Sequence, residues 1–220
     1  MSRVLNFTEH DFEQRSPEWY AVRLGKVTSS RASLMLAKLK KGEAAGRRNL
    51  RVGLVVDRLT GKSQEGTYLS RAMQDGIDRE DAALAAYEAE TGNLVERSGF
   101  LQHNELMAGA SLDAQVNNFV VMVEAKSPLP ATHLGYLRSG KVPHDYLCQV
   151  THQLYITGAE WCDWYSFHPD FPENLRGKLV RVTRDDVDLV AYDTALRAFL
   201  AEVDVEVQAV RTMAGGAEAA

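Results

Sequence analysis

Two short runs joined at Asn117-Asn118 constrain the fold more than any other part of this sequence. Residues 106–116 and 119–125 are rich in strand-forming residues, and asparagine tolerates the positive φ of a two-residue turn. The pattern predicts a β-hairpin in which Val116 lies opposite Phe119. Because side chains alternate along a strand, one face is polar and the other enters the core. The polar set is Ser111, Asp113, Glu124 and Lys126, and the core set is Val121, Val123 and Ala125.

The polar face of this hairpin groups two carboxylates with a lysine. Asp113 and Glu124 are diagonal neighbours across the expected strands, roughly 7–8 Å apart at Cα, so their carboxylates can converge on one cation. Oxygen ligands suit Mg²⁺, which neutralises phosphate charge and lowers the pKa of bound water. Lys126 can orient that water or help deprotonate it, since burial and a nearby cation lower a lysine pKa. The same short pattern also occurs on surface strands as an incidental ion pair.

The remaining sequence predicts one α/β domain, with a mixed central β-sheet flanked by helices. The 220 residues, 45% of them hydrophobic, suffice for a single core over 1–213, with a disordered tail at 214–220. Helices are expected to begin at caps, which are Ser16, Thr28, Asp78 and Thr183. Other expected elements are helices at 49–60 and 143–157, a mobile basic loop at 40–48, and strands at 94–102, 161–167 and 179–182.

Several classes of protein are excluded by residues that the chain lacks. Two cysteines, Cys148 and Cys162, cannot form a disulfide framework or a four-cysteine zinc or iron–sulfur site. There is no run of 18 apolar residues, and the acidic N-terminus lacks an apolar signal core. Motifs for a phosphate-binding loop, a nucleophile elbow and a paired-histidine zinc site are also missing. We therefore expect a cytoplasmic protein that does not bind membranes.

The charge of the chain is unevenly distributed. A formal net charge of −5 argues, taken alone, against a nucleic-acid partner. Between Arg23 and Lys62, however, eleven basic residues face only two acidic ones, which gives this segment +9 and leaves −14 on the rest. A basic segment in an otherwise acidic chain indicates an anionic partner, which the net charge of the whole chain does not reveal.

Two helical residues have both a functional and a structural interpretation. Glu80 shares an apolar stripe with Leu84 and Tyr87, so its carboxylate needs a partner, either a metal or an arginine such as Arg79 or Arg23. Gln149 lies in the middle of the helix over 143–157, next to the core position Val150. It is either a functional amide or the polar flank of an amphipathic helix.

Five sequence blocks, in order, resemble the phage lambda exonuclease family of viral recombination nucleases. The first combines Arg15-Ser16-Pro17-Glu18-Trp19 with residues 23–30, RLGKVTSS. The others are residues 76–80, 111–113, 124–126 and 146–150, and the resemblance covers about 14–170. Each block is weak alone, but five in register are specific. Departures from the family pattern are Leu112 for a proline and Ala114 for a glycine.

The resemblance implies a restriction-endonuclease-like core and a Mg²⁺-dependent exonuclease that digests linear duplex DNA from 5′-phosphorylated ends. It implies two metal ions, with Mn²⁺ as a substitute, and release of 5′ mononucleotides that leaves a 3′ strand for annealing. A closed homotrimer ring around DNA and a phage single-strand annealing protein are the implied partners, in the cytoplasm of a bacterial host. The basic segment is then expected to face DNA.

The resemblance also assigns roles residue by residue. It makes Asp113, Glu124, Lys126 and Glu80 catalytic, and the metal ligands would be Asp113, Glu124, Glu80 and the Ala125 carbonyl. It places the 5′-phosphate pocket at Arg23, Ser30, Ser111 and Gln149. Met73 falls at the position of a strand-separating wedge, where a core methionine is equally consistent, and Lys40 falls at a DNA groove contact. Alternatives are an endonuclease of the same fold and a catalytically silent module that binds DNA ends.

Overall fold

The computed structural model describes residues 5–63 and 70–216, without the side chains of 72, 73 and 214–216. Within these ranges, the strands form two four-stranded sheets. The first has the spatial order β1 (Phe7–His10), β3 (Phe100–His103), β4 (Ala108–Ser111) and β2 (Val27–Thr28). The second has the order β5 (Ala114–Val116), β6 (Val121–Lys126), β7 (Trp161–Phe167) and β8 (Gly177–Thr183). Each sheet contains one parallel pair, β2–β4 or β6–β7, so both are mixed, as the sequence predicts.

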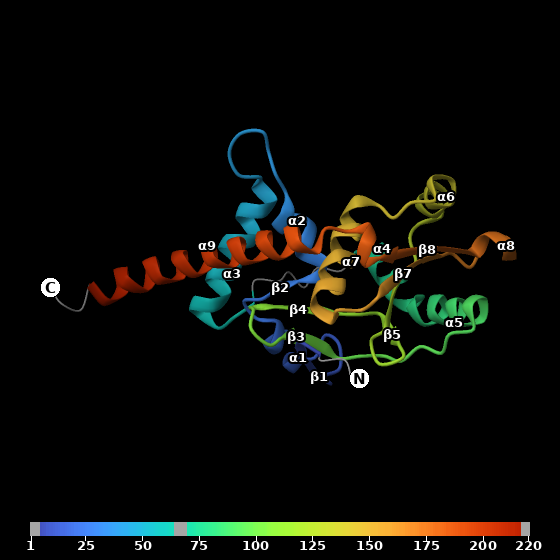
Figure 1. The fold of residues 1–220 in the computed structure, drawn as a ribbon, viewed down its shortest axis with the longest axis horizontal. Helices are drawn as coiled ribbons and strands as arrows, with labels where there is room; N and C mark the ends of the chain where they lie inside the picture. Colours follow the sequence, from blue (N-terminus) through green and yellow to red (C-terminus); the bar gives the residue numbers. More distant parts are fainter. Residues whose placement is uncertain (1–4, 64–69, 217–220) are drawn as a thin grey trace.

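Helices cover these sheets in layers (Figure 1). They are α1 (Pro17–Arg23), α2 (Ala32–Leu36), α3 (Ala45–Thr60), α4 (Arg71–Asp78), α5 (Glu80–Thr91), α6 (Pro130–Ser139), α7 (His144–Thr157), α8 (Glu173–Arg176) and α9 (Leu189–Gly216), with short 3-10 turns η1 (Ser29–Arg31) and η2 (Arg184–Asp186). Helix α5 packs on β6 and β7, while α7 contacts both sheets and α9 packs across α3. No helix in the described ranges is long and apolar enough to cross a membrane.

Strands β5, β6 and β7 of the second sheet are buried on both faces. Val121, Val123 and Ala125 pack with Leu84 and Tyr87 of α5, which confirms the core-facing set expected from the sequence. The opposite face carries Met122 and Trp164 into a larger core, which the apolar sides of α7 and α9 complete. A polar residue on that face, such as Glu124, is therefore enclosed by protein rather than exposed on a surface strand.

The turn between β5 and β6 differs from the predicted two-residue hairpin. Val116 pairs with Val121, not with Phe119, so the loop contains four residues. Asn117, Asn118 and Phe119 all have positive φ, between 52° and 63°. Phe119 leaves the strand because its ring is buried against Phe7, with centroids 5.0 Å apart, and its N–H donates to Gln115 Oε1 at 2.7 Å. The register shifts by two residues, which preserves the face of every side chain.

Several predicted element boundaries are also wrong. The strand expected at 106–116 breaks at Leu112-Asp113, so β4 and β5 belong to different sheets. The helix expected from Asp78 begins instead at Glu80, because α4 ends at Asp78. Thr183 caps only η2, and α9 starts at Leu189, where Asp188 Oδ1 accepts from Ala191 N–H at 2.8 Å. The Ser16 cap is confirmed, since its side chain accepts from Trp19 N–H.

Candidate active site

The break between the two sheets places Asp113 beside the end of β6. Ala125 N–H donates to Asp113 Oδ2 at 2.8 Å, and Lys126 Nζ lies 3.7 Å from the same oxygen. Lys126 also forms an ion pair with Glu124. The structure thus brings Asp113, Glu124 and Lys126 into contact, although its hairpin register differs from the predicted one. Leu112, which departs from the family pattern, is buried in the core and removes no polar group from this cluster.

The Glu124 carboxylate is fully buried and accepts hydrogen bonds from two amides of α7. Gln149 Nε2 donates to Oε1, and Gln153 Nε2 donates to Oε2. Gln149 and Gln153 lie one turn apart on α7 and so present their amides together. A buried charge needs such partners. Sequence reasoning missed Gln153, although its spacing of four from Gln149 was a visible signal.

The two carboxylates and the lysine perturb one another. Burial raises the pKa of Asp113 to about 6, and repulsion from Glu124 adds to the effect. Burial on its own would lower the pKa of Lys126, but Glu124 and Asp113 outweigh it and raise that pKa above its usual range. The carboxylates therefore shift the pKa of Lys126 in the direction opposite to the one expected from burial.

Glu80 approaches this cluster from the first turn of α5. Its partner is Arg97, which was not considered in the sequence analysis, rather than Arg79 or Arg23. Burial raises the pKa of Glu80, and repulsion from Asp113 raises it further. Glu80 and Asp113 are thus close enough to repel one another.

A cleft of about 620 Å³ opens over these groups. Its lining includes Glu80, Asp113, Ala125 and Lys126 together with Ser30, Arg15, Trp19 and Tyr146. Tyr146 lies beneath the lysine, with the Lys126 Nζ 5.5 Å from the ring centroid. The basic side chains of the cleft can bind an anionic substrate and its aromatic rings can stack on flat groups, whereas its carboxylates would need a bound cation beside that substrate.

The four residues expected to hold a 5′-phosphate are only partly assembled. Arg23 donates to Ser111 Oγ at 3.2 Å, and its guanidinium stacks on the Trp19 ring at 3.9 Å from the centroid. Ser30 lines the cleft from η1. Gln149 is turned toward Glu124. Of the four residues, Arg23 and Ser111 are therefore in contact, Ser30 faces the cleft and Gln149 faces Glu124.

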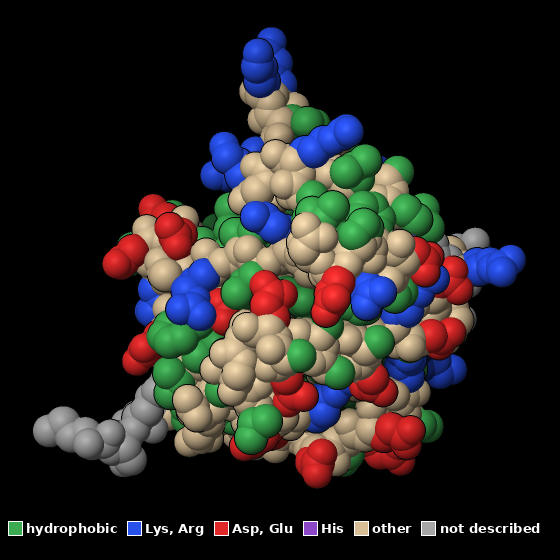
Figure 2. All heavy atoms as spheres, turned by 90° about the vertical axis from the view of Figure 1, so that its right-hand side faces the viewer, with side chains coloured by type: hydrophobic (Ala, Val, Ile, Leu, Met, Phe, Trp, Pro, Cys, Tyr) green, Lys and Arg blue, Asp and Glu red, His purple; other side chains and the backbone are tan. Residues whose placement is uncertain are grey.

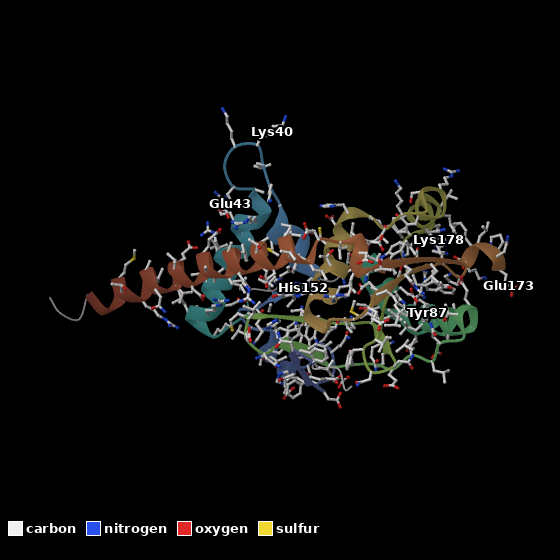
Figure 3. All side chains as sticks on the ribbon, in the orientation of Figure 1. Lys40, Glu43, Tyr87, His152, Glu173 and Lys178 are labelled. Atoms are coloured by element: carbon white, nitrogen blue, oxygen red, sulfur yellow. The ribbon has the colours of Figure 1, made fainter. Side chains whose placement is uncertain are left out.

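Of the two further predicted residues, only Lys40 has a described side chain. Lys40 is exposed on the loop between α2 and α3 and projects away from the body (Figure 3). Met73 falls in α4, but its side chain is outside the described part of the structure.

The donor chemistry of the cleft fits a hard divalent cation. Its candidate ligands are oxygens, from Glu80, Asp113, Glu124 and the Ala125 carbonyl, as Mg²⁺ prefers. Burial and, after it, repulsion between carboxylates raise the pKa values of Glu80 and Asp113, and a bound cation would favour the ionised form of both groups. Among the described residues, no three His, Cys, Asp or Glu side chains are already close enough to hold a metal. Instead, Arg97 forms an ion pair with Glu80 and Lys126 forms one with Glu124.

Three arginines of the basic segment are neutralised within the fold. They lie on α3 and pair with acids of α9, as Arg47–Glu202, Arg51–Glu206 and Arg58–Asp204. Helix α9 therefore uses part of the acidic excess of the chain. On the face shown in Figure 2, the uppermost charged side chains are basic, and acidic and basic side chains are interspersed below them.

Comparisons with known proteins agree with this fold. The model of the YqaJ-like viral recombinase domain matches residues 18–160. An alkaline exonuclease, LHK-Exo, from Laribacter hongkongensis is 34% identical, with a TM-score of 0.83, over 91% of this chain and 99% of that one. The same values hold for the LHK-Exo structure in complex with dAMP.

A phage-related exonuclease from Haemophilus somnus 129PT shares the fold at 13% identity, with a TM-score of 0.66 over 86% of this chain and 96% of that chain. The search of curated proteins gave no match. The likeness to alkaline exonuclease structures confirms the expected fold class, and the family match confirms the resemblance seen in the five sequence blocks. The chain therefore belongs to the lambda-exonuclease-like family of YqaJ-like viral recombinase domains.

Proposed function

We propose that this protein is a Mg²⁺-dependent exonuclease that degrades linear duplex DNA from 5′-phosphorylated ends. The contact cluster of Asp113, Glu124 and Lys126 on an open cleft carries this proposal. Family membership and the likeness to an alkaline exonuclease support the broader assignment to DNA exonucleases. The related LHK-Exo has been captured with dAMP, a mononucleotide of the class that we propose as product.

The oxygens of Asp113, Glu124, Glu80 and the Ala125 carbonyl would hold the cation, and two ions would be consistent with family expectations. A bound Mg²⁺ would neutralise phosphate charge and lower the pKa of its water. Lys126 is protonated beside Glu124 and Asp113, so it can orient the attacking water and balance negative charge at the scissile phosphate. Gln149 and Gln153 hold the Glu124 carboxylate in place during these steps.

Selection of the DNA end would fall to the pocket around Arg23 and Ser111. An arginine fork beside a hydroxyl matches the geometry of a phosphate monoester. Ser30 and Gln149 would complete the pocket, and Met73 and Lys40 would contact the duplex. The products would be 5′ mononucleotides and a 3′ strand for recombination by annealing.

We further propose that three copies close into a ring around DNA, because a topological link would favour processive digestion. A phage single-strand annealing protein would take over the 3′ strand, and the site of action would be the cytoplasm of the bacterial host.

One assay with three substrates tests the function. In Mg²⁺, linear duplex DNA with a 5′-phosphate should be digested fastest, linear DNA with a 5′-hydroxyl more slowly, and closed circular DNA not at all. Cleavage of the circle would instead establish an endonuclease of this fold. Retarded migration of linear DNA in a gel without hydrolysis would establish a silent end-binding module. Samples without Mg²⁺, containing EDTA, serve as the matched control.

A further inference from the structure

The segment between α5 and β3 is fixed to both sheets on either side of Arg97. Glu96 and Gln115 of β5 exchange two backbone hydrogen bonds of 2.8 Å, and Gln115 Nε2 also donates to Glu96 Oε2 at 2.8 Å. Two residues after Arg97, Gly99 N–H donates to Glu9 Oε1 in β1 at 3.0 Å. A Cβ at Gly99 would lie 2.0 Å from the carbonyl oxygen of His10, so only glycine permits this approach. The backbone that carries Arg97 is therefore rigidly placed.

From this position the Arg97 guanidinium joins both acid-bearing segments of the cleft. Its Nη1 donates to Glu80 Oε1 and, at 2.9 Å, to the backbone carbonyl of Asp113. Its Nη2 pairs with Asp81, the next residue in the first turn of α5. The planar fork of arginine can reach these acceptors at once, whereas the single ammonium of a lysine cannot.

The contact leaves half of the Glu80 carboxylate available. Arg97 engages Oε1, and Oε2 accepts no hydrogen bond from the described part of the chain. Glu80 and Asp113 line the same cleft. Groups that hold one oxygen of a ligating carboxylate fix its orientation and often tune metal affinity strongly.

We propose that Arg97 is a positioning residue for the divalent-cation site, which holds Glu80 by Oε1 so that Oε2 serves the cation together with Asp113. This role rests on the metal site of the proposed function. It assigns Arg97 to the support of the reaction, since the guanidinium acts through Glu80 and need not touch the substrate. The alternative role is competition, in which Arg97 occupies Glu80 in place of the cation.

Direct binding of Mn²⁺ to DNA-free protein distinguishes these roles, with free Mn²⁺ measured by electron paramagnetic resonance. Arg97→Ala should bind Mn²⁺ about 10–100-fold more weakly than the wild type. Arg97→Lys keeps the positive charge but lacks the planar guanidinium, so its Mn²⁺ affinity should lie between those of the wild type and Arg97→Ala. Asp81→Asn is the matched control, because it removes another partner of the same guanidinium from a side chain that is 94% exposed. Its affinity should stay within about twofold of the wild type.

Mn²⁺ binding by Arg97→Ala that is as tight as in the wild type, or tighter, would overturn the positioning role. A loss of Mn²⁺ affinity in Asp81→Asn as large as in Arg97→Ala would overturn it as well. Thermal unfolding in EDTA checks that Arg97→Ala is folded. If it is not, the Mn²⁺ affinity of Arg97→Lys is compared with that of the wild type instead, and equal or tighter binding overturns the positioning role. A wild type that binds no Mn²⁺ would overturn both this role and the metal site. A wild type that binds Mn²⁺ but digests no DNA would reject the exonuclease proposal alone.

Discussion

Replacing Asp113 with asparagine should make the metal-free protein more stable while it destroys activity. In the folded chain, burial and the Glu124 carboxylate raise the pKa of Asp113 to about 6. An aspartate in an unfolded chain titrates near pH ~4. A tenfold change in acidity corresponds to about 1.4 kcal/mol, so the ionised Asp113 costs the fold about 3 kcal/mol at pH 8. Because the side chain is 19% exposed, solvent screening makes this an upper value.

The sign of the effect fixes a pH window. Below about pH 4 the carboxyl is protonated in both folded and unfolded chains, so it contributes no penalty. The penalty grows between about pH 4 and pH 6 and is complete above that range. The amide introduced by Asp113→Asn would remain neutral throughout and would keep an oxygen to accept from Ala125 N–H. The gain in stability of Asp113→Asn over the wild type should therefore be largest at pH 8 and vanish near pH 4.

Urea unfolding in EDTA, at pH 8 and near pH 4, measures this difference. Asp185→Asn is the control, since it removes an exposed carboxyl outside the cleft and should leave stability within about 0.5 kcal/mol at both pH values. Saturating Mg²⁺ should reverse the order at pH 8, because binding stabilises only a chain with an intact site. If Asp113→Asn is no more stable than the wild type at pH 8 in EDTA, the electrostatic account of the cluster is wrong.

Two further outcomes test the residues proposed for chemistry and for end recognition. Lys126→Ala should reduce turnover on 5′-phosphorylated duplex DNA by about 10²–10⁴-fold, while DNA binding in Ca²⁺ stays nearly unchanged; a rate close to wild type would remove Lys126 from the mechanism. Arg23→Ala should lower the preference for 5′-phosphate over 5′-hydroxyl ends by about 10–100-fold, because a charge-assisted hydrogen bond contributes about 1.5–3 kcal/mol. Competition between the two substrates measures this preference. An unchanged preference would place the phosphate pocket elsewhere.

The side-chain directions of the hairpin were predictable from the sequence, but its register was not. Alternation alone puts Asp113 and Glu124 on one face, and a shift of two residues leaves this result intact. The shift itself arises from the burial of Phe119 against Phe7, a contact between residues more than a hundred positions apart. Local turn preference for Asn117-Asn118 could not anticipate that tertiary contact.

The partners of the acidic residues were less predictable than the acidic residues themselves. Glu80 was singled out because a carboxylate on an apolar stripe needs a partner. Its actual partner, Arg97, is brought near by the bridge between Glu96 and Gln115, which lies outside any local pattern. Gln153 could have been found from its helical spacing to Gln149, whereas Arg97 required the tertiary structure.

The ion pairs between α3 and α9 have a consequence for the order in which the chain is made. Arg47 and Arg51 precede their acidic partners Glu202 and Glu206 by 155 residues. At ordinary rates of synthesis, this separation corresponds to roughly 8–30 s on the ribosome. Throughout that interval Glu43, the local partner of both arginines, is already translated, but the partners on α9 are not, so the arginines are only partly compensated beside abundant ribosomal RNA. A message truncated before α9 would leave Arg47, Arg51 and Arg58 permanently without these partners.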